Sequence, residues 1–310
     1  MSLSEKVARD PAADDGAPEP GGTGTGRSSR LRSLSSGPYL MVLPLVLFAA
    51  VVFLYPIVDM AISTLVVTDP DTGGRSISWE SFQRVVADDY AREMIFRTLR
   101  VGVLTTLLTL VLAYPVTLWM RELTPRWRGV LVTILLSPLL MSIVVRTLGW
   151  VVLLGPGGFI NDSLERIGLG PVSFLYTEGA IVFGLAQVLL GFMVLALLTT
   201  VLQIPDTVVA AGANLGARPW RVLWHIVVPM TRPGILAGAA IVFPLSASAY
   251  VTPALLGGSH NPVMATEVYT QAIVQLEFDR AAAMALVLFA LVTIGVALLG
   301  VLGRNRAESA

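Results

Sequence analysis

Few residues in this sequence can carry acid–base, nucleophilic or metal chemistry. The 310 residues contain no cysteine and two histidines, His225 and His260, which excludes disulfides, thiolate metal sites and a cysteine nucleophile. Clustered catalytic patterns such as His-Glu-x-x-His or Gly-x-Ser-x-Gly are missing from the apolar segments. The single lysine, Lys6, lies in a polar stretch without the glycines of a phosphate-binding P-loop. The sequence therefore predicts no catalytic residue, no bound metal or cofactor, and no ATP hydrolysis by this chain.

Two charged residues lie inside strongly apolar segments. A charge at the centre of a bilayer costs about 2.5–3.5 kcal/mol or more, so each is expected to face protein or water. Asp59 either attracts a cationic solute or lies near the external interface and pairs with an arginine, and the interfacial role is preferred. Arg146 either lines a pore or pins its helix by pairing with a carboxylate or with carbonyl groups.

The most informative stretch is a polar loop at residues 203–233, which reads IPDTVVAAGANLGARPWRVLWHIVVPMTRPG from Ile204 onward. Asp206 is a good N-cap for a helix, since its carboxylate can accept from free backbone N–H groups. Gly216 suits the left-handed backbone position that ends a helix, and Pro219 suits the first turn of a second helix. The loop is therefore predicted to form a helix, a sharp glycine turn and a second helix at the inner membrane surface.

The side chains of this loop divide into apolar, basic and small groups. Arg218 precedes a proline and is expected to be extended. One apolar face is predicted from residues at i, i+3, i+4 and i+7, and Arg221 and His225 fall away from it. The face comprises Trp220, Leu223, Trp224 and Val227, and the small residues are Ala210, Ala211, Gly212 and Ala213. Such an element can enter a groove on a soluble partner, or it can anchor the loop to the membrane without any partner.

The composition places this loop in a membrane protein. The chain is 55% hydrophobic and 14% charged, with a mean hydropathy of +0.74, whereas soluble domains are about 25% charged. Apolar runs of roughly 18 or more residues are long enough to cross a bilayer as helices. The predicted fold is an all-α integral membrane domain at residues 37–303 with about six transmembrane helices, near 39–65, 99–120, 129–154, 179–202, 234–256 and 282–303.

The distribution of basic residues predicts the orientation. Most of the Lys and Arg fall on one side if both termini are cytoplasmic, and this side also holds the 203–233 loop. Residues 1–36 are rich in Gly, Pro, Ser and charged residues and are expected to be a disordered cytoplasmic tail; residues 304–310 form a second tail. The net charge of zero argues against nucleic-acid binding.

The loop resembles the "EAA" coupling loop of binding-protein-dependent ABC importer permeases. That family pattern is roughly Glu-Ala-Ala-x-x-x-Gly followed, after about nine residues, by Ile-x-Leu-Pro. It falls here on residues 210–216 and ends at Ile226 and Pro229. The middle alanine Ala211, the glycine, the isoleucine and the proline match, while Ala210 replaces the glutamate and Gly212 the second alanine. Because this chain lacks the glutamate, a specific salt bridge from that position to the ATPase is not expected.

The resemblance extends over most of the membrane region and is nearest to the polyamine (spermidine/putrescine) importer group. It is carried by LTPRWRGVLVTILLSPLLMS at 123–142, RTLGWVVLLGPGGFIN at 146–161 and YVTPALLGG at 250–258. It implies a type I ABC importer permease of a bacterial inner membrane, which forms the pore with a second permease. An ABC ATPase dimer would bind the coupling loop, and an extracytoplasmic solute-binding protein would deliver the solute.

The resemblance also implies that the fifth span lines the pathway. This span carries Ser248 and Tyr250, and either Ser248 or Ala249 stands near a position that is acidic in many relatives. That difference weakens the expectation of a cationic solute. A stand-alone secondary transporter or channel is the alternative, although internal repeats and intramembrane charge relays are not evident.

Overall fold

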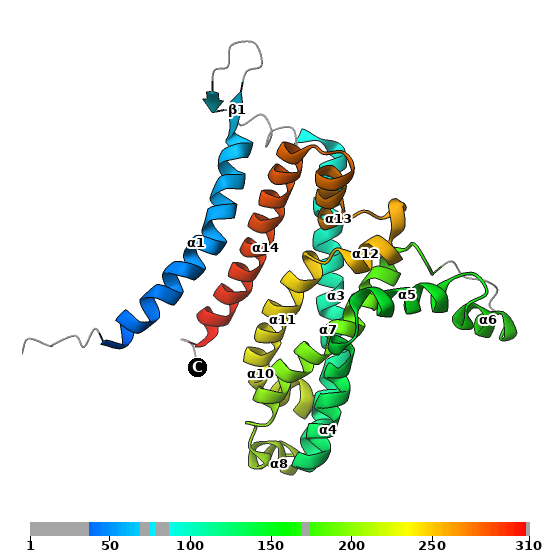
Figure 1. The fold of residues 1–310 in the computed structure, drawn as a ribbon. Helices are drawn as coiled ribbons and strands as arrows, with labels where there is room; N and C mark the ends of the chain where they lie inside the picture. The colour runs from blue at the N-terminus through cyan, green and yellow to red at the C-terminus, as the bar shows by residue number, and fades with distance from the viewer. Residues whose placement is uncertain (1–36, 69–74, 78–86, 169–173, 308–310) are drawn as a thin grey trace, which may run out of the picture. The chain divides into compact units, whose positions relative to one another are not determined.

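The computed structural model describes residues 37–68, 75–77, 87–168 and 174–307 (Figure 1). The predicted 1–36 tail lies outside the described residues, as does the very end of the second tail. The chain divides into two parts, Met1–Val52 and Phe53–Ala310, which we describe separately. The described section of the first part is the beginning of helix α1, Gly37–Leu65. This helix is apolar over 21 residues, Val42–Ile62, and is long enough to cross a membrane.

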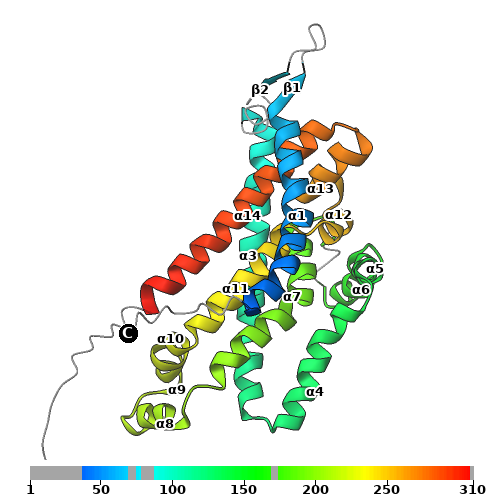
Figure 2. The same ribbon diagram turned by 60° about the vertical axis from the view of Figure 1, so that its left-hand side comes forward.

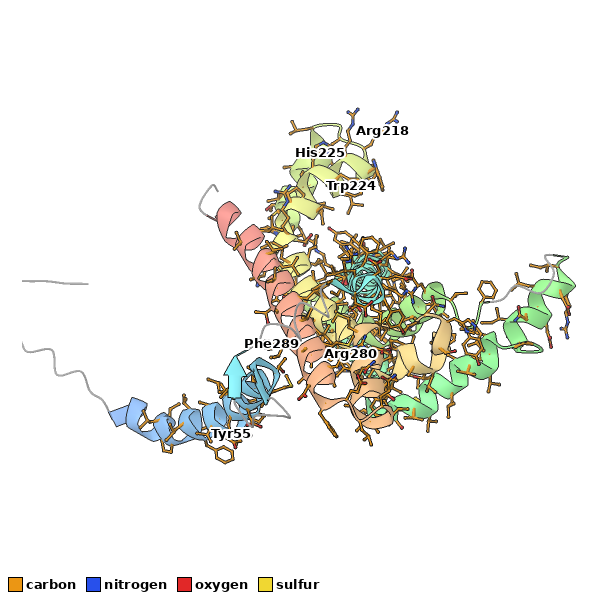
Figure 3. The ribbon with its side chains drawn as sticks, turned by 90° about the horizontal axis from the view of Figure 1, so that it is seen from above. Tyr55, Arg218, Trp224, His225, Arg280 and Phe289 are labelled. Carbon is orange, nitrogen blue, oxygen red and sulfur yellow. The ribbon has the colours of Figure 1, made fainter. Side chains whose placement is uncertain are left out.

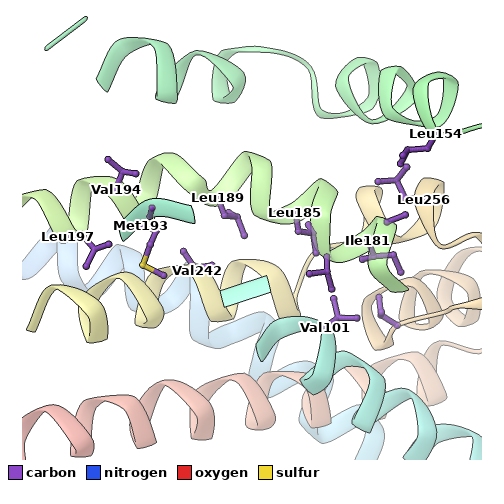
Figure 4. Packing of buried hydrophobic residues seen from close by; sticks show 14 of the residues in the cluster. Val101, Leu154, Ile181, Leu185, Leu189, Met193, Val194, Leu197, Val242 and Leu256 are labelled. Carbon is purple, nitrogen blue, oxygen red and sulfur yellow. The ribbon is translucent and has the colours of Figure 1, made fainter. Parts of the chain in front are cut away.

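Three long helices form the centre of the second part. They are α3 (Asp89–Glu122), α7 (Glu178–Val201) and α11 (Arg232–Ala247), and each packs against the other two (Figures 1 and 4). Small residues allow the close approach, as at Gly234, where an added Cβ would lie 2.9 Å from the carbonyl oxygen of Ala196 on α7. The core includes Val101, Ile181, Leu185, Leu189, Met193, Val194, Leu197, Val242 and Leu256.

The described chain contains five helical segments long and apolar enough to span a membrane, and a sixth if one bent pair counts as a single span. The bent pair is Pro219–Met230 with Arg232–Ala247, which meet at 65°. The last span lies in α14, Phe278–Ala307, which packs on α11. These helices confirm the prediction of a helical membrane protein with about six spans.

The predicted third span, 129–154, is interrupted rather than continuous. It consists of α4 (Pro125–Leu136), a 3-10 turn η1 (Ser137–Leu140) and α5 (Ile143–Leu154), followed by a short helix α6 (Phe159–Arg166). The reason is Pro138, which has no N–H for the helical ladder and collides with the preceding turn. The hydroxyl of Ser137 donates to the Ile134 carbonyl at 2.8 Å, which satisfies one of the exposed acceptors.

The predicted fifth span, 234–256, is also divided. Helix α11 ends at Ala247, and α12 begins at Val251 and ends at Leu256. Pro253 lacks the N–H that would continue the ladder across the junction. The interruption places Ser248 and Tyr250 between two helices rather than on the face of one helix.

Short elements connect the spans. A two-stranded antiparallel hairpin pairs β1 (Val66–Thr68) with β2 (Arg75–Ile77), with Val66 opposite Ile77. Between α12 and α14 lie the 3-10 turn η3 (Gly258–His260), helix α13 (Met264–Tyr269) and a π-helical turn η4 (Thr270–Val274). Helix α13 packs on both α3 and α14.

Candidate functional site

The loop segment, residues 204–230, joins α7 to α11 at one end of the helices (Figure 2). It contains α8 (Asp206–Asn214), α9 (Pro219–Val222), a π-helical turn η2 (Leu223–Val227) and α10 (Val228–Met230). The backbone φ of Gly216 is +78°, which confirms the predicted left-handed glycine turn. Arg218 is extended and Pro219 lies in the first turn of α9, as predicted.

The prediction that Asp206 caps α8 is wrong by one position, because Pro205 is the N-cap residue. The Asp206 carboxylate instead accepts a hydrogen bond from Arg121 Nη2 on α3 at 2.5 Å. The same nitrogen donates to the carbonyl of Ile204 at 2.8 Å. The carboxylate still lies in the first turn of α8, where the helix dipole favours a negative charge. Arg121 therefore ties the end of α3 to the start of the loop segment.

The inner side of the loop segment is a small apolar cluster. Its buried members are Ile204, Val222 and Val227, and Leu118 of α3 packs against them. Gly212 faces this cluster, because an added Cβ would lie 2.8 Å from Cδ1 of Ile226. Gly212 thus permits close packing of α8 on Ile226 within the loop segment itself. The other small residues, Ala210, Ala211 and Ala213, are exposed.

The outer side of the loop segment carries large exposed apolar side chains. Leu215 is 89% exposed, Trp220 67% and Trp224 51%, and the two indole rings meet edge to face with centroids 5.5 Å apart. The predicted apolar face therefore does not bury as one unit: Val227 turns inward and both tryptophans turn outward. The π-helical turn changes the helical phase between them.

Basic side chains flank these exposed apolar groups. Arg218, Arg221 and His225 are exposed, and His225 Nδ1 lies 3.1 Å from the carbonyl oxygen of Arg221. Figure 3 shows Arg218, Trp224 and His225 together on the projecting segment, apart from Phe289 of α14. The remaining predicted loop residues, Ile226 and Pro229, are half-buried.

A second arginine, which the sequence did not single out, joins α3 to α4. Arg128 donates from Nε to the Met120 carbonyl at 3.1 Å, and from Nη2 to the carbonyls of Arg121 and Leu123 at 3.1 and 3.0 Å. It thereby satisfies acceptors that the end of α3 leaves free. The sequence feature that could have indicated this role is the position of Arg128, three residues after Pro125 in the first turn of α4.

The predicted pathway residues do not gather at one place. Arg146 on α5 is half-buried and donates from Nη1 to the carbonyl of Pro138 at 2.5 Å. It therefore pairs with a carbonyl, one of the two roles that the sequence left open. Asp59 is exposed on α1.

Ser248 and Tyr250 do lie together, at the junction between α11 and α12. They line an open, mostly apolar groove of about 720 Å³ together with residues of α13, η4 and α14, among them Tyr269 and Phe289. The Tyr250 and Tyr269 rings lie 4.6 Å apart, while the Ser248 hydroxyl donates to the Pro244 carbonyl at 2.6 Å. Of the four predicted pathway residues, these two share a cavity.

An ion-pair cluster lies at the opposite end of α3 from the loop segment, and the sequence did not reveal it. Arg97 pairs with Glu93 at 2.5 Å and with Glu178, the first residue of α7, at 3.5 Å. Arg100 also bonds Glu178. Arg97 further donates to the His260 carbonyl at 3.5 Å and to the Pro262 carbonyl at 3.4 Å. The cluster joins α3, α7 and the turn after α12.

Comparison with solved structures defines the class of this fold. The chain superposes on a bacterial ABC transporter that imports the acidic polysaccharide alginate, with a TM-score of 0.67 and 20% identity. The match covers 86% of this chain and 95% of that chain. A second structure of the alginate transporter, in complex with an alginate pentasaccharide-bound periplasmic protein, matches with the same TM-score. The chain therefore shares the fold of these chains of a bacterial ABC importer.

Comparison of sequences agrees with the fold. No family model matches the chain. The spermidine/putrescine permease PotB of Salmonella typhimurium (strain SL1344) is 28% identical over 202 residues, which cover 62% of this chain and 70% of PotB. PotB of Escherichia coli K12 is also 28% identical, with 74% of that protein covered. The molybdenum permease ModB of Mycobacterium bovis is 26% identical over 232 residues, covering 74% of this chain and 85% of ModB.

Fold and sequence agree: the chain shares its fold with a protein of a bacterial ABC importer and is similar in sequence to permease subunits of such importers. Its apolar helices, five of which are long enough to cross a membrane among the described residues, fit a multi-pass membrane protein.

Proposed function

We propose that this chain is a permease subunit of a bacterial ABC importer in the inner membrane, that it forms one half of a translocation pore, and that a second permease forms the other half. An ABC ATPase dimer binds the loop segment, and an extracytoplasmic solute-binding protein delivers the solute. Both termini lie in the cytoplasm, on the same side as the loop segment. The solute is a polyamine or a similar small molecule, a proposal supported by the similarity to PotB.

The observation that carries the proposal is the two-sided construction of the loop segment. Leu215, Trp220 and Trp224 are exposed at its outer side, whereas Val222 and Val227 are buried at its inner side. Exposed apolar patches rimmed by polar groups mark protein–protein or membrane interaction sites, and tryptophan and arginine are enriched among the residues that dominate binding at protein interfaces. The arrangement supports docking of a partner rather than simple anchoring of a connection.

The contacts of the inner side provide a route from this docking surface to the membrane helices. Arg121 connects Asp206 and Ile204 to the end of α3, and Leu118 of the same helix contacts the apolar cluster. Helix α3 packs along α7 and α11. A partner that binds the loop segment differently in its ATP and ADP states would therefore shift the equilibrium between conformations of the helices.

The side chains at the Ser248 groove support a small solute with apolar character. The groove is lined by Tyr250, Tyr269 and Phe289, and aromatic faces attract cationic groups. A relative named for spermidine/putrescine transport and one named for molybdenum transport are similarly identical to this chain, at 28% and 26%. The proposed solute-binding protein is therefore expected to determine which solute is imported.

Purification from the native membrane in mild detergent, followed by mass spectrometry, tests the assembly. Recovery of an ATPase, a second permease and a solute-binding protein with the wild-type chain is the expected result. A Trp220→Ala/Trp224→Ala variant should lose the ATPase and retain the second permease, because it alters the docking surface alone. Recovery of the chain by itself, with solute uptake after reconstitution without ATP, would contradict the proposal and identify a stand-alone carrier or channel.

A further inference from the structure

Helix α13 places a carboxylate in the interior of the protein. The Glu267 residue is 8% exposed, and the helix packs against both α3 and α14. The same helix contributes Met264 to a buried apolar cluster that also contains Met94 of α3 and Met284 of α14. A carboxylate in such surroundings requires hydrogen bonds and a compensating positive charge, or it takes up a proton.

The hydrogen bonds of Glu267 come from two neutral side chains. Gln271, one helical turn further along, donates from Nε2 to Glu267 Oε1 at 2.7 Å. The Tyr90 hydroxyl on α3 lies 3.5 Å from Oε2, which is the outer limit of a hydrogen bond. Neither contact neutralises the carboxylate.

Gln271 adds a second unsatisfied acceptor at the same place. The residue is 3% exposed, and its Oε1 atom has no hydrogen-bond partner among the described residues. Rotating the amide would bring Oε1 to the carboxylate and leave the N–H₂ group without a partner. A buried amide oxygen without a donor costs about 1–3 kcal/mol. Glu267 and Gln271 therefore present adjacent oxygen acceptors: the carboxylate has neutral donors but no salt-bridge partner, and the amide Oε1 has no donor among the described residues.

Arginines of the neighbouring helices form ion pairs with carboxylates other than that of Glu267. Arg97 of α3 pairs with Glu93 and Glu178, and Arg280 of α14 pairs with Asp88 at 3.0 Å. Among the residues that the structure describes, none forms a salt bridge with Glu267. Unless the carboxyl takes up a proton, a compensating charge has to come from outside the described residues.

We propose that Glu267 and Gln271 bind a monovalent cationic group, with Tyr90 at the entrance. Oxygen acceptors suit either an alkali ion or a primary ammonium group, which would bind through the same carboxylate and amide oxygens. The exposed Tyr90 ring lies beside the site, so the cation can enter from the surface. The ammonium source rests on the amine solute proposed above, whereas the alkali source does not.

Thermal unfolding of the full-length chain in detergent tests the site without requiring an ATPase or transport. The protein is prepared with N-methyl-D-glucamine, which is too bulky for a buried site, as the sole cation. Sodium, potassium, methylammonium and putrescine are then titrated separately at constant ionic strength. A saturable rise of the unfolding temperature is expected with at least one of them. Saturation by sodium or potassium identifies the alkali source, and saturation by methylammonium or putrescine identifies the ammonium source.

Two variants and a matched control locate the effect. Glu267→Gln should abolish the cation dependence, and Glu277→Gln, the same change at an exposed residue nearby, should retain it. If Glu267→Gln does not accumulate, Gln271→Leu keeps the carboxylate and should raise the apparent dissociation constant about tenfold or more. The proposal is overturned if no cation gives saturable stabilisation, if Glu267→Gln responds like the wild type, or if Gln271→Leu leaves the constant unchanged. A wild-type unfolding temperature that depends on pH but on none of these cations also overturns it, because the carboxyl is then neutralised by a proton.

Discussion

Arg121 at the end of α3 holds Asp206, the first residue of α8, through a contact of 2.5 Å between Nη2 and Oδ1. The two residues are 85 positions apart in the chain. Arg121 is mostly buried and also bonds the carbonyl of Ile204, whereas the Asp206 side chain is almost fully exposed. The contact joins the proposed docking surface to a central membrane helix.

Removal of Arg121 is expected to uncouple the importer. Arg121→Ala should lower ATP-dependent uptake by about tenfold or more, while membrane insertion and ATPase binding persist. Asp206→Asn should have a smaller effect, since the bond from Arg121 to Ile204 remains. Uptake into vesicles and ATP hydrolysis by the purified complex measure the two activities. The control is Arg126→Ala, at an exposed arginine in the first turn of α4, close to the end of α3. Equal uptake by the Arg121 and Arg126 variants would contradict the role of Arg121.

The glycine turn of the loop segment should be essential for coupling. Proline cannot adopt the φ of +78° at Gly216, so Gly216→Pro should displace α9 and abolish ATPase binding and uptake. Gly168 provides a close control, because its φ is +79° and its N–H also bonds a carbonyl three residues earlier. Gly168→Pro should retain ATPase binding. Co-purification of the ATPase with both variants would show that the turn is not needed for docking.

The exposed tryptophans are expected to contribute binding energy and little stability. Trp220→Ala/Trp224→Ala should weaken ATPase binding by about 10- to 100-fold, as expected for central aromatic residues of an interface. The unfolding temperature should change little, because both side chains are exposed. Trp119→Ala on α3, also exposed, should leave the affinity unchanged. Surface plasmon resonance with the purified subunits measures the affinity, and wild-type binding by the double variant would refute the docking surface.

Arg146 is expected to stabilise the interrupted span rather than to select the solute. Arg146→Gln removes the charged donor to the Pro138 carbonyl and should reduce the free energy of unfolding by about 1.5–3 kcal/mol. Arg146→Lys keeps a positive donor and should lose less. Thermal unfolding and solute uptake separate the two roles. Normal stability with altered solute preference in Arg146→Gln would instead indicate a pore-lining residue.

The local structure of the loop segment was predictable from its residues. A glycine that must adopt positive φ at position 216 and a proline in the first turn at position 219 are properties of single residues and their neighbours. The helical membrane class was predictable for a similar reason, because the length and apolarity of a segment decide whether it can cross a bilayer. The hydrophobic pattern did not predict the interruptions at Pro138 and Pro253, since proline is tolerated inside some membrane helices and breaks others.

Contacts between distant residues were decided only by the tertiary structure. Periodicity grouped Trp220 with Val227 on one apolar face, but Val227 is buried in the cluster on which Leu118 of α3 packs, whereas Trp220 is exposed. The same holds for Arg121 with Asp206 and for Tyr90 with Glu267, which are 85 and 177 residues apart. The amino-acid sequence by itself determined the helical membrane class and the glycine and proline turns of the loop segment, because these depend on local composition and spacing. Which charges pair, and which carboxylate is buried without an ionic partner, depends on how the helices pack, and this became evident only in the folded chain.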